Sequence, residues 1–99
     1  MTTGITRDNA KQRVGKGWSK LLDKIYDRLP PEAWVMDVKE KFGGLRVNAV
    51  DIDEGVWEFI WNVENESITI CENCGEPGKP RDGGWIKTLC DKCEGVDNG

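Results

Sequence analysis

The segment CENCGEPGKPRDGGWIKTLCDKC, residues 71–93, contains two Cys-x-x-Cys pairs with fifteen residues between them. Two residues between paired cysteines allow a tight turn that directs both sulfurs to one ion about 2.3 Å away, and this spacing is typical of structural zinc sites. The predicted ligands are Cys71, Cys74, Cys90 and Cys93. Four thiolates complete a tetrahedral shell and leave no position for water, so we expect one structural Zn²⁺ without a catalytic role.

Paired cysteines can also form disulfide bonds or carry out redox chemistry. The redox state of the cellular compartment indicates which of these uses, or metal binding, is expected. Residues 1–18 contain no apolar stretch of signal-peptide length, and no run approaches the roughly 18 apolar residues of a membrane span. We therefore expect a soluble cytoplasmic protein. Thiols stay reduced in the cytoplasm, which favours metal binding by both pairs.

Turn-forming residues dominate the interval between the two pairs, and a strand-like run over residues 85–89 leads into the second pair. This layout predicts a zinc ribbon or a pair of zinc knuckles over residues 71–95. A treble clef would place the second pair at the start of a helix, but only six residues follow the last cysteine, so we predict a short tail over residues 96–99. Trp85 and Arg81 are a candidate cation–π pair that would steady the loop.

An amphipathic helix is predicted before the hairpin region, because apolar residues recur at the helical spacing i, i+3, i+4, i+7 and i+11. These residues are Trp18, Leu21, Leu22, Ile25 and Leu29. Pro30 and Pro31 end the helix, since proline lacks the backbone N–H and restricts the residue before it. Residues 1–15 show no such periodicity, and we predict a flexible N-terminal arm for them.

Apolar and polar residues then alternate with period two from Trp34 to Ile52, which predicts two β-strands. Gly43 and Gly44 form the expected two-residue turn, because glycine readily adopts the positive φ of a primed turn. We expect this hairpin to pack against the preceding helix.

Residues 53–67 fit two patterns. A helical stripe would contain Val56, Phe59, Ile60 and Val63, and a strand face would contain Trp57, Phe59, Trp61 and Val63. The length of the segment and an N-cap at Asp51 or Asp53 favour the helix. The predicted class is therefore α+β, with a helix, a β-hairpin and a second helix within residues 16–70 and a Cys₄ zinc module packed on this core.

Charge is divided unevenly along the chain, whose formal net charge is −4. Residues 1–46 contain ten Lys/Arg and six Asp/Glu, and residues 47–99 contain four and twelve, which gives +4 and −8. An acidic surface binds nucleic acid poorly, because phosphate contacts depend on clustered Lys and Arg. Direct contact with single-stranded nucleic acid would therefore use the basic hairpin, through Lys39, Lys41, Phe42 and Arg46.

The tryptophans of the second helix have two interpretations. Trp57 and Trp61 lie one turn apart and widen the apolar stripe beyond what a small domain easily covers, so they either pack in the core or contact a partner. Glu58 directly follows Trp57, and Glu64 lies three residues after Trp61. An aromatic centre with acidic neighbours predicts a surface that binds a basic, partly apolar patch on another protein.

Catalysis has little support in the sequence. The chain has no histidine, no nucleophile beside a base, and no cysteine outside the two predicted metal-binding pairs. Asp51, Asp53 and Glu54 are a candidate site for a hard cation, and helix capping explains them equally well. We expect no enzymatic activity.

Residues 39–46 (KEKFGGLR), residues 71–78 (CENCGEPG) with Arg81, and residues 84–93 (GWIKTLCDKC) form a specific combination of short motifs. Together they resemble small zinc-knuckle proteins encoded by bacteriophages and prophages. The resemblance spans roughly residues 18–93 and implies the order helix, hairpin, helix and zinc knuckles. It also implies a viral protein in the cytoplasm of a bacterial host, but no particular activity.

The sequence as a whole indicates a protein that acts by binding. The leading hypothesis is contact with a host protein, which would inhibit or redirect a host polymerase, nuclease or defence system. The alternative is binding of single-stranded nucleic acid through the hairpin. A structural or assembly role is the third.

Overall fold

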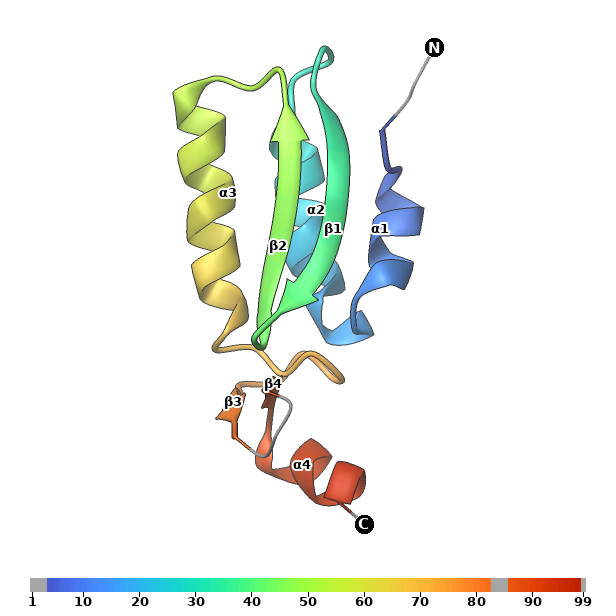
Figure 1. Cartoon of the computed structure of the whole chain (residues 1–99), viewed down its shortest axis with the longest axis vertical. Helices are drawn as coiled ribbons and strands as arrows, with labels where there is room; N and C mark the ends of the chain where they lie inside the picture. The colour runs from blue at the N-terminus through green and yellow to red at the C-terminus, as the bar shows by residue number, and fades with distance from the viewer. Residues whose placement is uncertain (1–3, 83–85, 99) are drawn as a thin grey trace.

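The computed structural model describes residues 4–82 and 86–98, and it has the α+β architecture predicted from the sequence (Figure 1). Its elements in chain order are α1 (Arg7–Arg13), the 3₁₀ turn η1 (Lys16–Trp18), α2 (Ser19–Arg28), β1 (Trp34–Lys41), β2 (Gly44–Val50), α3 (Glu54–Ser67), β3 (Lys79–Arg81), β4 (Lys87–Leu89) and α4 (Asp91–Asn98). We call residues 4–70 the body and residues 71–98 the metal module. The metal module lies at one end of the elongated body (Figure 1).

The core of the body lies between the β1–β2 hairpin and its helices. α2 begins at Ser19 and ends at Arg28, before Pro30, as the apolar spacing predicted. The fully buried Trp18 immediately precedes α2. The buried apolar residues of the core are Ala10, Trp18, Leu21, Leu22, Ile25, Val35, Val38, Leu45, Val47, Val56, Ile60 and Val63.

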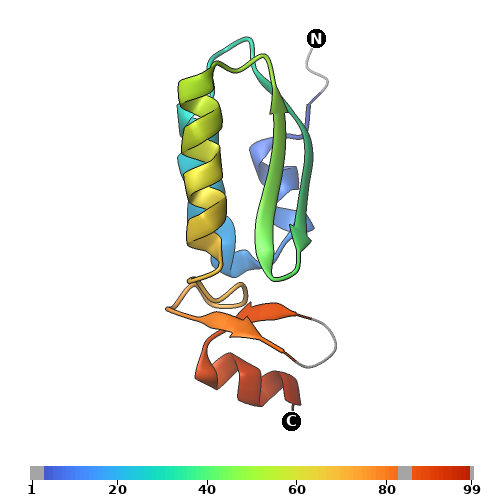
Figure 2. The same cartoon turned by 60° about the vertical axis from the view of Figure 1, so that its left-hand side comes forward.

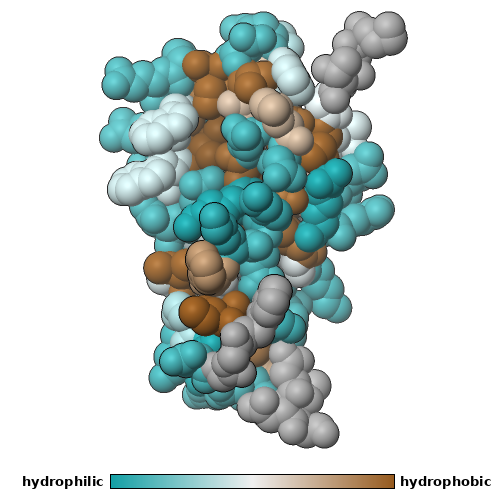
Figure 3. All heavy atoms as spheres, in the orientation of Figure 1, coloured by the Kyte–Doolittle hydropathy of each residue, from teal (hydrophilic) through white to brown (hydrophobic). Residues whose placement is uncertain are grey.

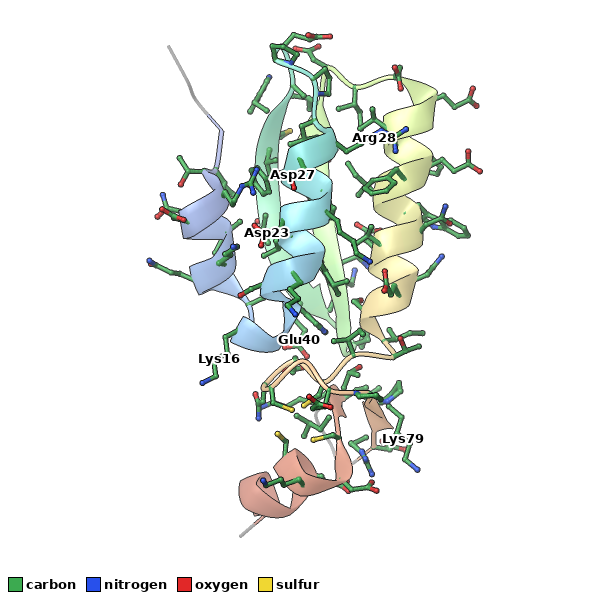
Figure 4. All side chains as sticks on the ribbon, turned by 180° about the vertical axis from the view of Figure 1, so that it is seen from behind. Lys16, Asp23, Asp27, Arg28, Glu40 and Lys79 are labelled. Carbon is green, nitrogen blue, oxygen red and sulfur yellow. The ribbon has the colours of Figure 1, made fainter. Side chains whose placement is uncertain are left out.

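The N-terminal segment contains a helix where we expected a flexible arm. α1 packs beside α2, and the ammonium of Lys11 and the guanidinium of Arg7 lie 2.8 Å and 3.1 Å from the carboxylate of Asp23 on α2. Asp23 and Asp27 are labelled on α2, on the side that faces α1, in Figure 4. Ala10 is the one buried residue of α1, so this helix has no apolar stripe. The apolar periodicity of the sequence therefore did not predict it.

The turn of the hairpin is Phe42-Gly43, one residue earlier than the Gly43-Gly44 turn that we predicted. Lys41 pairs with Gly44, and the two turn residues have φ of +54° and +80°, as a type I′ turn requires. This register pairs two buried valines, Val38 and Val47. A turn shifted by one residue would break that pairing, so the core selects between the two glycine-containing turns.

The alternation predicted for β1 fails at Met36. The register shifts between Val35 and Asp37, which marks a β-bulge. A bulge inserts one residue and exchanges the two faces of the strand beyond it. Val35 and Val38 are therefore both buried, whereas Met36 is 51% exposed.

α3 confirms the helical alternative for residues 53–67. Asp53 caps it, because its carboxylate accepts a hydrogen bond of 2.9 Å from the Val56 N–H. The stripe formed by Val56, Ile60 and Val63 is buried against α2 and β2. Figure 2 shows α3 running alongside the hairpin.

The metal module consists of a second antiparallel pair, β3–β4, followed by α4 (Figure 2). α4 extends through Asn98, where we predicted a tail over residues 96–99. The helix begins at Asp91, so the second cysteine pair supplies its first turn and few residues are needed after it. Counting only the residues after the last cysteine therefore underestimated the helix.

Candidate metal centre

The four predicted ligands come together in the metal module, where their sulfur atoms are yellow in Figure 4. Their Sγ atoms all lie within 4.8 Å of one another, and the Sγ atoms of Cys74 and Cys90 are 3.7 Å apart. Two sulfurs bound to one zinc ion at about 2.3 Å in tetrahedral geometry lie about 3.8 Å apart. The sulfur cluster therefore fits one tetrahedral metal ion.

The first knuckle is a turn closed by backbone hydrogen bonds. The Cys71 N–H donates to the Glu76 carbonyl over 2.7 Å, and the Gly75 N–H donates to the Cys71 carbonyl over 2.9 Å. Gly75 has a φ of +87°, which a residue with a side chain rarely adopts. The turn returns Cys74 to the side of Cys71, which is buried while Cys74 is exposed.

The second pair combines the end of a strand with the start of a helix. β4 ends at the buried Leu89 and delivers Cys90 directly before α4. The Cys93 N–H lies 3.4 Å from the Cys90 Sγ and donates to it, and the Glu94 N–H donates to the Cys90 carbonyl over 3.0 Å. The N-terminal end of α4 thus presents the Cys93 N–H to the Cys90 sulfur, an arrangement that stabilises the negative charge of a thiolate.

The thiols influence one another strongly at these distances. Hydrogen bonding with Cys90 and then Cys71 raises the pKa of Cys93 to about 12. Burial opposes the ionisation of Cys71, but hydrogen bonds from the N–H groups of Cys90, Cys74 and Asn73 lower its pKa to about 6. The thiolate form of Cys71 is thus favoured, while the Cys93 thiol is held protonated. A bound cation is the usual means of holding all four sulfurs as thiolates.

Arg81 holds the module together through ion pairs that the sequence did not predict; the sequence suggested it only as part of a motif and as a cation–π partner of Trp85. Its side chain is 15% exposed and reaches two carboxylates of α4, Asp91 at 2.7 Å and Glu94 at 2.9 Å. It also donates to the Leu89 carbonyl over 3.0 Å. The guanidinium lowers the pKa of Asp91 below its ordinary value. Trp85, the predicted cation–π partner of Arg81, lies outside the described residues.

Glycine allows the body to approach the first knuckle closely. The Gly17 N–H donates to the Glu72 carbonyl over 2.8 Å. A Cβ atom on Gly17 would lie 2.1 Å from the Cys71 carbonyl oxygen, and one on Gly15 would lie 2.1 Å from the Glu72 carbonyl oxygen. Any side chain at Gly15 or Gly17 would therefore push the knuckle away from the body.

A buried carboxylate lies at the same junction. Glu72 is 5% exposed, and its carboxylate accepts a hydrogen bond of 3.1 Å from the Thr88 N–H. Burial, together with the nearby charge of Glu40, raises the pKa of Glu72 to about 7. Glu40 is labelled at this end of the hairpin in Figure 4, and its Oε2 is buried without a hydrogen-bond partner among the residues that the structure describes. No sequence pattern indicated this pair, because it forms only where the hairpin meets the metal module.

The predicted partner-binding residues lie on α3. Trp57 and Trp61 are 58% and 51% exposed, so neither is a core residue in this chain. Trp57, Trp61 and Glu64 line a groove of about 150 Å³ between α3 and β2. Glu58 is exposed on the same helix. The structure thus places the four residues on one helix, three of them around one groove.

The predicted nucleic-acid-binding residues gather near the turn of the hairpin. Lys39 pairs with Arg46 across the two strands, and Lys41 follows on the same face of β1. All three are exposed. Phe42 is 72% exposed, and the Lys41 ammonium lies 5.9 Å from the centre of its ring. They form one small basic and aromatic patch.

The acidic residues before α3 act as a helix cap. Asp53 fills the N-cap position, and Glu54 lies in the first turn, where the helix dipole favours negative charge. Among residues 4–82 and 86–98, the four cysteines are the one group of potential ligands close enough together to hold a metal ion. The capping interpretation of Asp53 and Glu54 therefore has structural support, and the hard-cation interpretation has none in this part of the chain.

Comparison of the chain with protein-family models, with curated proteins and with solved structures gave no match. Within the described part of the chain, no helix combines the length and apolar character needed to cross a bilayer.

Proposed function

We propose that this chain is a zinc-stabilised module that binds another protein through the exposed face of α3. The observation that carries this proposal is the exposure of two tryptophans one helical turn apart, each by more than half. Large aromatic side chains gain free energy when they leave water, and tryptophan is enriched among the residues that dominate protein interfaces. A pair of exposed indoles beside a groove therefore supports a contact surface.

The partner surface should be basic and partly apolar. Glu54 and Glu58 are exposed on α3, and Glu64 lines the groove beside Trp61. Residues 47–99 carry a formal charge of −8 before any contribution of the metal centre. Complementary charge around an aromatic centre accelerates association and selects among partners.

The metal has a structural role in this proposal. We infer that it is zinc, because four thiolates in tetrahedral reach of one ion are the ligand set of structural zinc sites. The closed shell leaves no position for substrate, which supports binding without catalysis. The ion would stabilise residues 71–98, which contain little buried apolar surface of their own.

The resemblance to phage-encoded zinc-knuckle proteins supports a bacterial host protein as the partner. A host polymerase, nuclease or defence enzyme carries a basic groove for nucleic acid, and an acidic module can occupy such a groove by charge complementarity. Binding there would inhibit or redirect the host enzyme.

The test compares matched aromatic variants in capture of host proteins from a bacterial lysate. Trp57→Ala and Trp61→Ala should each reduce capture of a specific protein by a factor on the order of ten or more, with unchanged thermal stability. Phe42→Ala, an exposed aromatic on the hairpin, should retain capture. If Phe42→Ala lost capture of the host protein while both tryptophan variants retained it, the interface would instead lie on the hairpin.

Binding of single-stranded nucleic acid is a second candidate, favoured by the shared exposed face of Lys39, Lys41 and Arg46 next to Phe42. A labelled oligonucleotide of about 20 residues should then bind at low salt, lose affinity steeply as salt increases, and fail to bind when the three cations are changed to Glu. The absence of any binding at low salt would contradict this candidate. The formal charge of −4 already disfavours it.

A further inference from the structure

The outer edge of β2 is covered by α3 over part of its length. The Leu45 N–H donates to the Ser67 hydroxyl over 2.9 Å, and the Val47 N–H donates to the Glu64 carboxylate over 2.8 Å. Side chains of α3 thus take the place of a neighbouring strand along this part of the edge. Such capping protects an edge strand from pairing with other chains.

Ala49 is the next residue of β2 whose backbone points away from β1. Its partner across the hairpin is Val35, and the Val35 carbonyl accepts from the Ile5 N–H over 2.8 Å on the far side of β1. The Val35–Ala49 pair is therefore a non-hydrogen-bonded pair, so the N–H and C=O of Ala49 also point outward, towards α3. Among the hydrogen bonds of the described residues, no α3 side chain reaches the Ala49 N–H.

The groove opens at this uncovered part of the edge. It has a volume of about 150 Å³ and is lined by Val47, Asn48, Ala49, Ile52, Trp57, Ile60, Trp61 and Glu64. Its lining therefore combines apolar side chains, two partly exposed indoles, a strand edge and one carboxylate. Figure 3 shows hydrophobic surface between α3 and the hairpin in the upper half of the view.

Glu64 gives the groove its chemical preference. Burial raises the pKa of its carboxyl group, and the Val47 N–H and the charge of Arg46 only partly oppose this effect. Among the described residues Glu64 forms no ion pair, and the Arg46 guanidinium donates instead to the Leu45 carbonyl over 3.3 Å. A partly buried carboxylate without a cation favours a ligand that brings one, since an apolar ligand would remove its remaining water.

We propose that the groove binds an extended segment of the partner whose main chain pairs with β2 at Ala49 and whose arginine or lysine side chain lies along Trp57 and Trp61 towards Glu64. This inference rests on the proposed function and specifies its binding mode. Addition of a strand to a sheet edge supplies main-chain hydrogen bonds and leaves side-chain pockets to set specificity. An indole face and a carboxylate together attract a cationic side chain with an aliphatic stem.

The test uses zinc-loaded, ¹⁵N-labelled full-length chain and the probe peptide Ac-Thr-Val-Arg-Val-Thr-NH₂. The amide signal of Ala49 and the indole signals of Trp57 and Trp61 should shift in a saturable way. Two matched peptides should each bind about fivefold or more weakly: one with neutral citrulline in place of arginine, and one with N-methylated valines that cannot pair with the strand.

Protein variants separate the charge in the groove from the charge around it. Glu64→Gln should abolish the difference between the arginine and citrulline peptides. Glu32→Gln removes the same charge from an exposed position in the α2–β1 connection, outside the lining of the groove, and should preserve that difference.

Several results would overturn the inference. These are equal binding of the arginine and citrulline peptides, full binding of the N-methylated peptide, shifts centred on Lys39 and Arg46, or no saturable shift at millimolar peptide. Shifts of the Ala49 and tryptophan signals on concentrating the protein alone would instead assign the groove to a second copy. Capture of a host protein that depends on Trp57 and Trp61, without peptide binding, would leave the proposed function intact and reject this binding mode.

Discussion

Trp18 donates its indole N–H to the carbonyl oxygen of Ile70 over 2.9 Å, across 52 positions of sequence. Trp18 is fully buried and directly precedes α2, and Ile70 directly precedes the first cysteine. On the other side of that cysteine, the Glu72 carbonyl accepts from the Gly17 N–H. The body therefore holds the first knuckle by the two carbonyls that flank Cys71.

Replacement of Trp18 by Phe should weaken this connection. It leaves the Ile70 carbonyl without its donor and a small cavity in the core, and we expect the free energy of unfolding to fall by about 2–4 kcal/mol. Urea unfolding followed by circular dichroism measures the loss, and amide exchange at residues 71–75 should accelerate. Trp57→Phe is the matched control and should stay within about 0.5 kcal/mol of the wild type, because Trp57 is exposed. Equal losses in both variants would contradict this role for Trp18.

Gly17→Ala should separate the metal module from the body. The new Cβ would lie 2.1 Å from the Cys71 carbonyl oxygen, so the backbone must move. We expect a loss of about 2 kcal/mol or more in stability and weaker metal binding in a competition assay with a chelator. Gly95→Ala on α4 is the control: no atom of the described part of the chain lies within 4 Å of its Cβ position, and alanine should stabilise the helix by about 0.5–1 kcal/mol. Unchanged metal affinity in Gly17→Ala would show that the contact is dispensable.

Removal of the metal should unfold the metal module selectively. The buried apolar cluster lies entirely within residues 10–63, so the body retains its own core, whereas residues 71–98 depend on the ion. In excess chelator, amide signals of residues 71–98 should lose dispersion while those of α2 and the hairpin remain. Cobalt should bind in a ratio of one per chain with the absorption spectrum of tetrahedral thiolate coordination, and Cys74→Ser should alter that spectrum. An unchanged NMR spectrum in chelator would rule out a metal-dependent fold.

The attachment of α1 should depend on pH. Hydrogen bonds from Lys11 and then Arg7 lower the pKa of Asp23 below its ordinary value of 3.8. A lowered carboxyl pKa stabilises the folded state above the unfolded pKa, and this stabilisation is lost as the pH falls through the folded pKa.

Asp23→Asn should therefore lower the free energy of unfolding at pH 7, and its difference from the wild type should shrink in acid below the ordinary carboxyl pKa and also at high salt. Urea unfolding at several pH values measures both trends. Glu32→Gln, an exposed change in the α2–β1 connection, should show neither trend. A difference for Asp23→Asn that persists unchanged at low pH would reject the electrostatic attachment of α1.

Local patterns account for what the sequence predicted correctly. The spacing of Trp18, Leu21, Leu22 and Ile25 predicted α2, because a helix repeats its faces every 3.6 residues. Asp51 and Asp53 were the two predicted caps for the start of α3, and Asp53 fills that position with a side chain that reaches only its own first turn. The two cysteine pairs predicted the metal centre, because each turn presents its two sulfurs without help from distant residues.

Two features that the sequence did not predict arise from contacts between different segments. α1 is attached by Arg7 and Lys11 to a carboxylate on another helix, and ion pairs leave no periodic pattern. The choice of Phe42-Gly43 as the turn followed from the pairing of Val38 with Val47, since two adjacent glycines made two turns possible locally.

The sequence by itself determined α2, α3, the hairpin and the metal ligands, since short-range spacing and the geometry of turns are sufficient for these. Only the tertiary structure decided that Trp57 and Trp61 remain exposed, because burial depends on what other segments cover. It also decided that Glu64 closes one part of the β2 edge and leaves Ala49 open beside the groove. α3 and β2 diverge towards the top of Figure 1, where the groove opens between them, and no local sequence pattern encodes their separation.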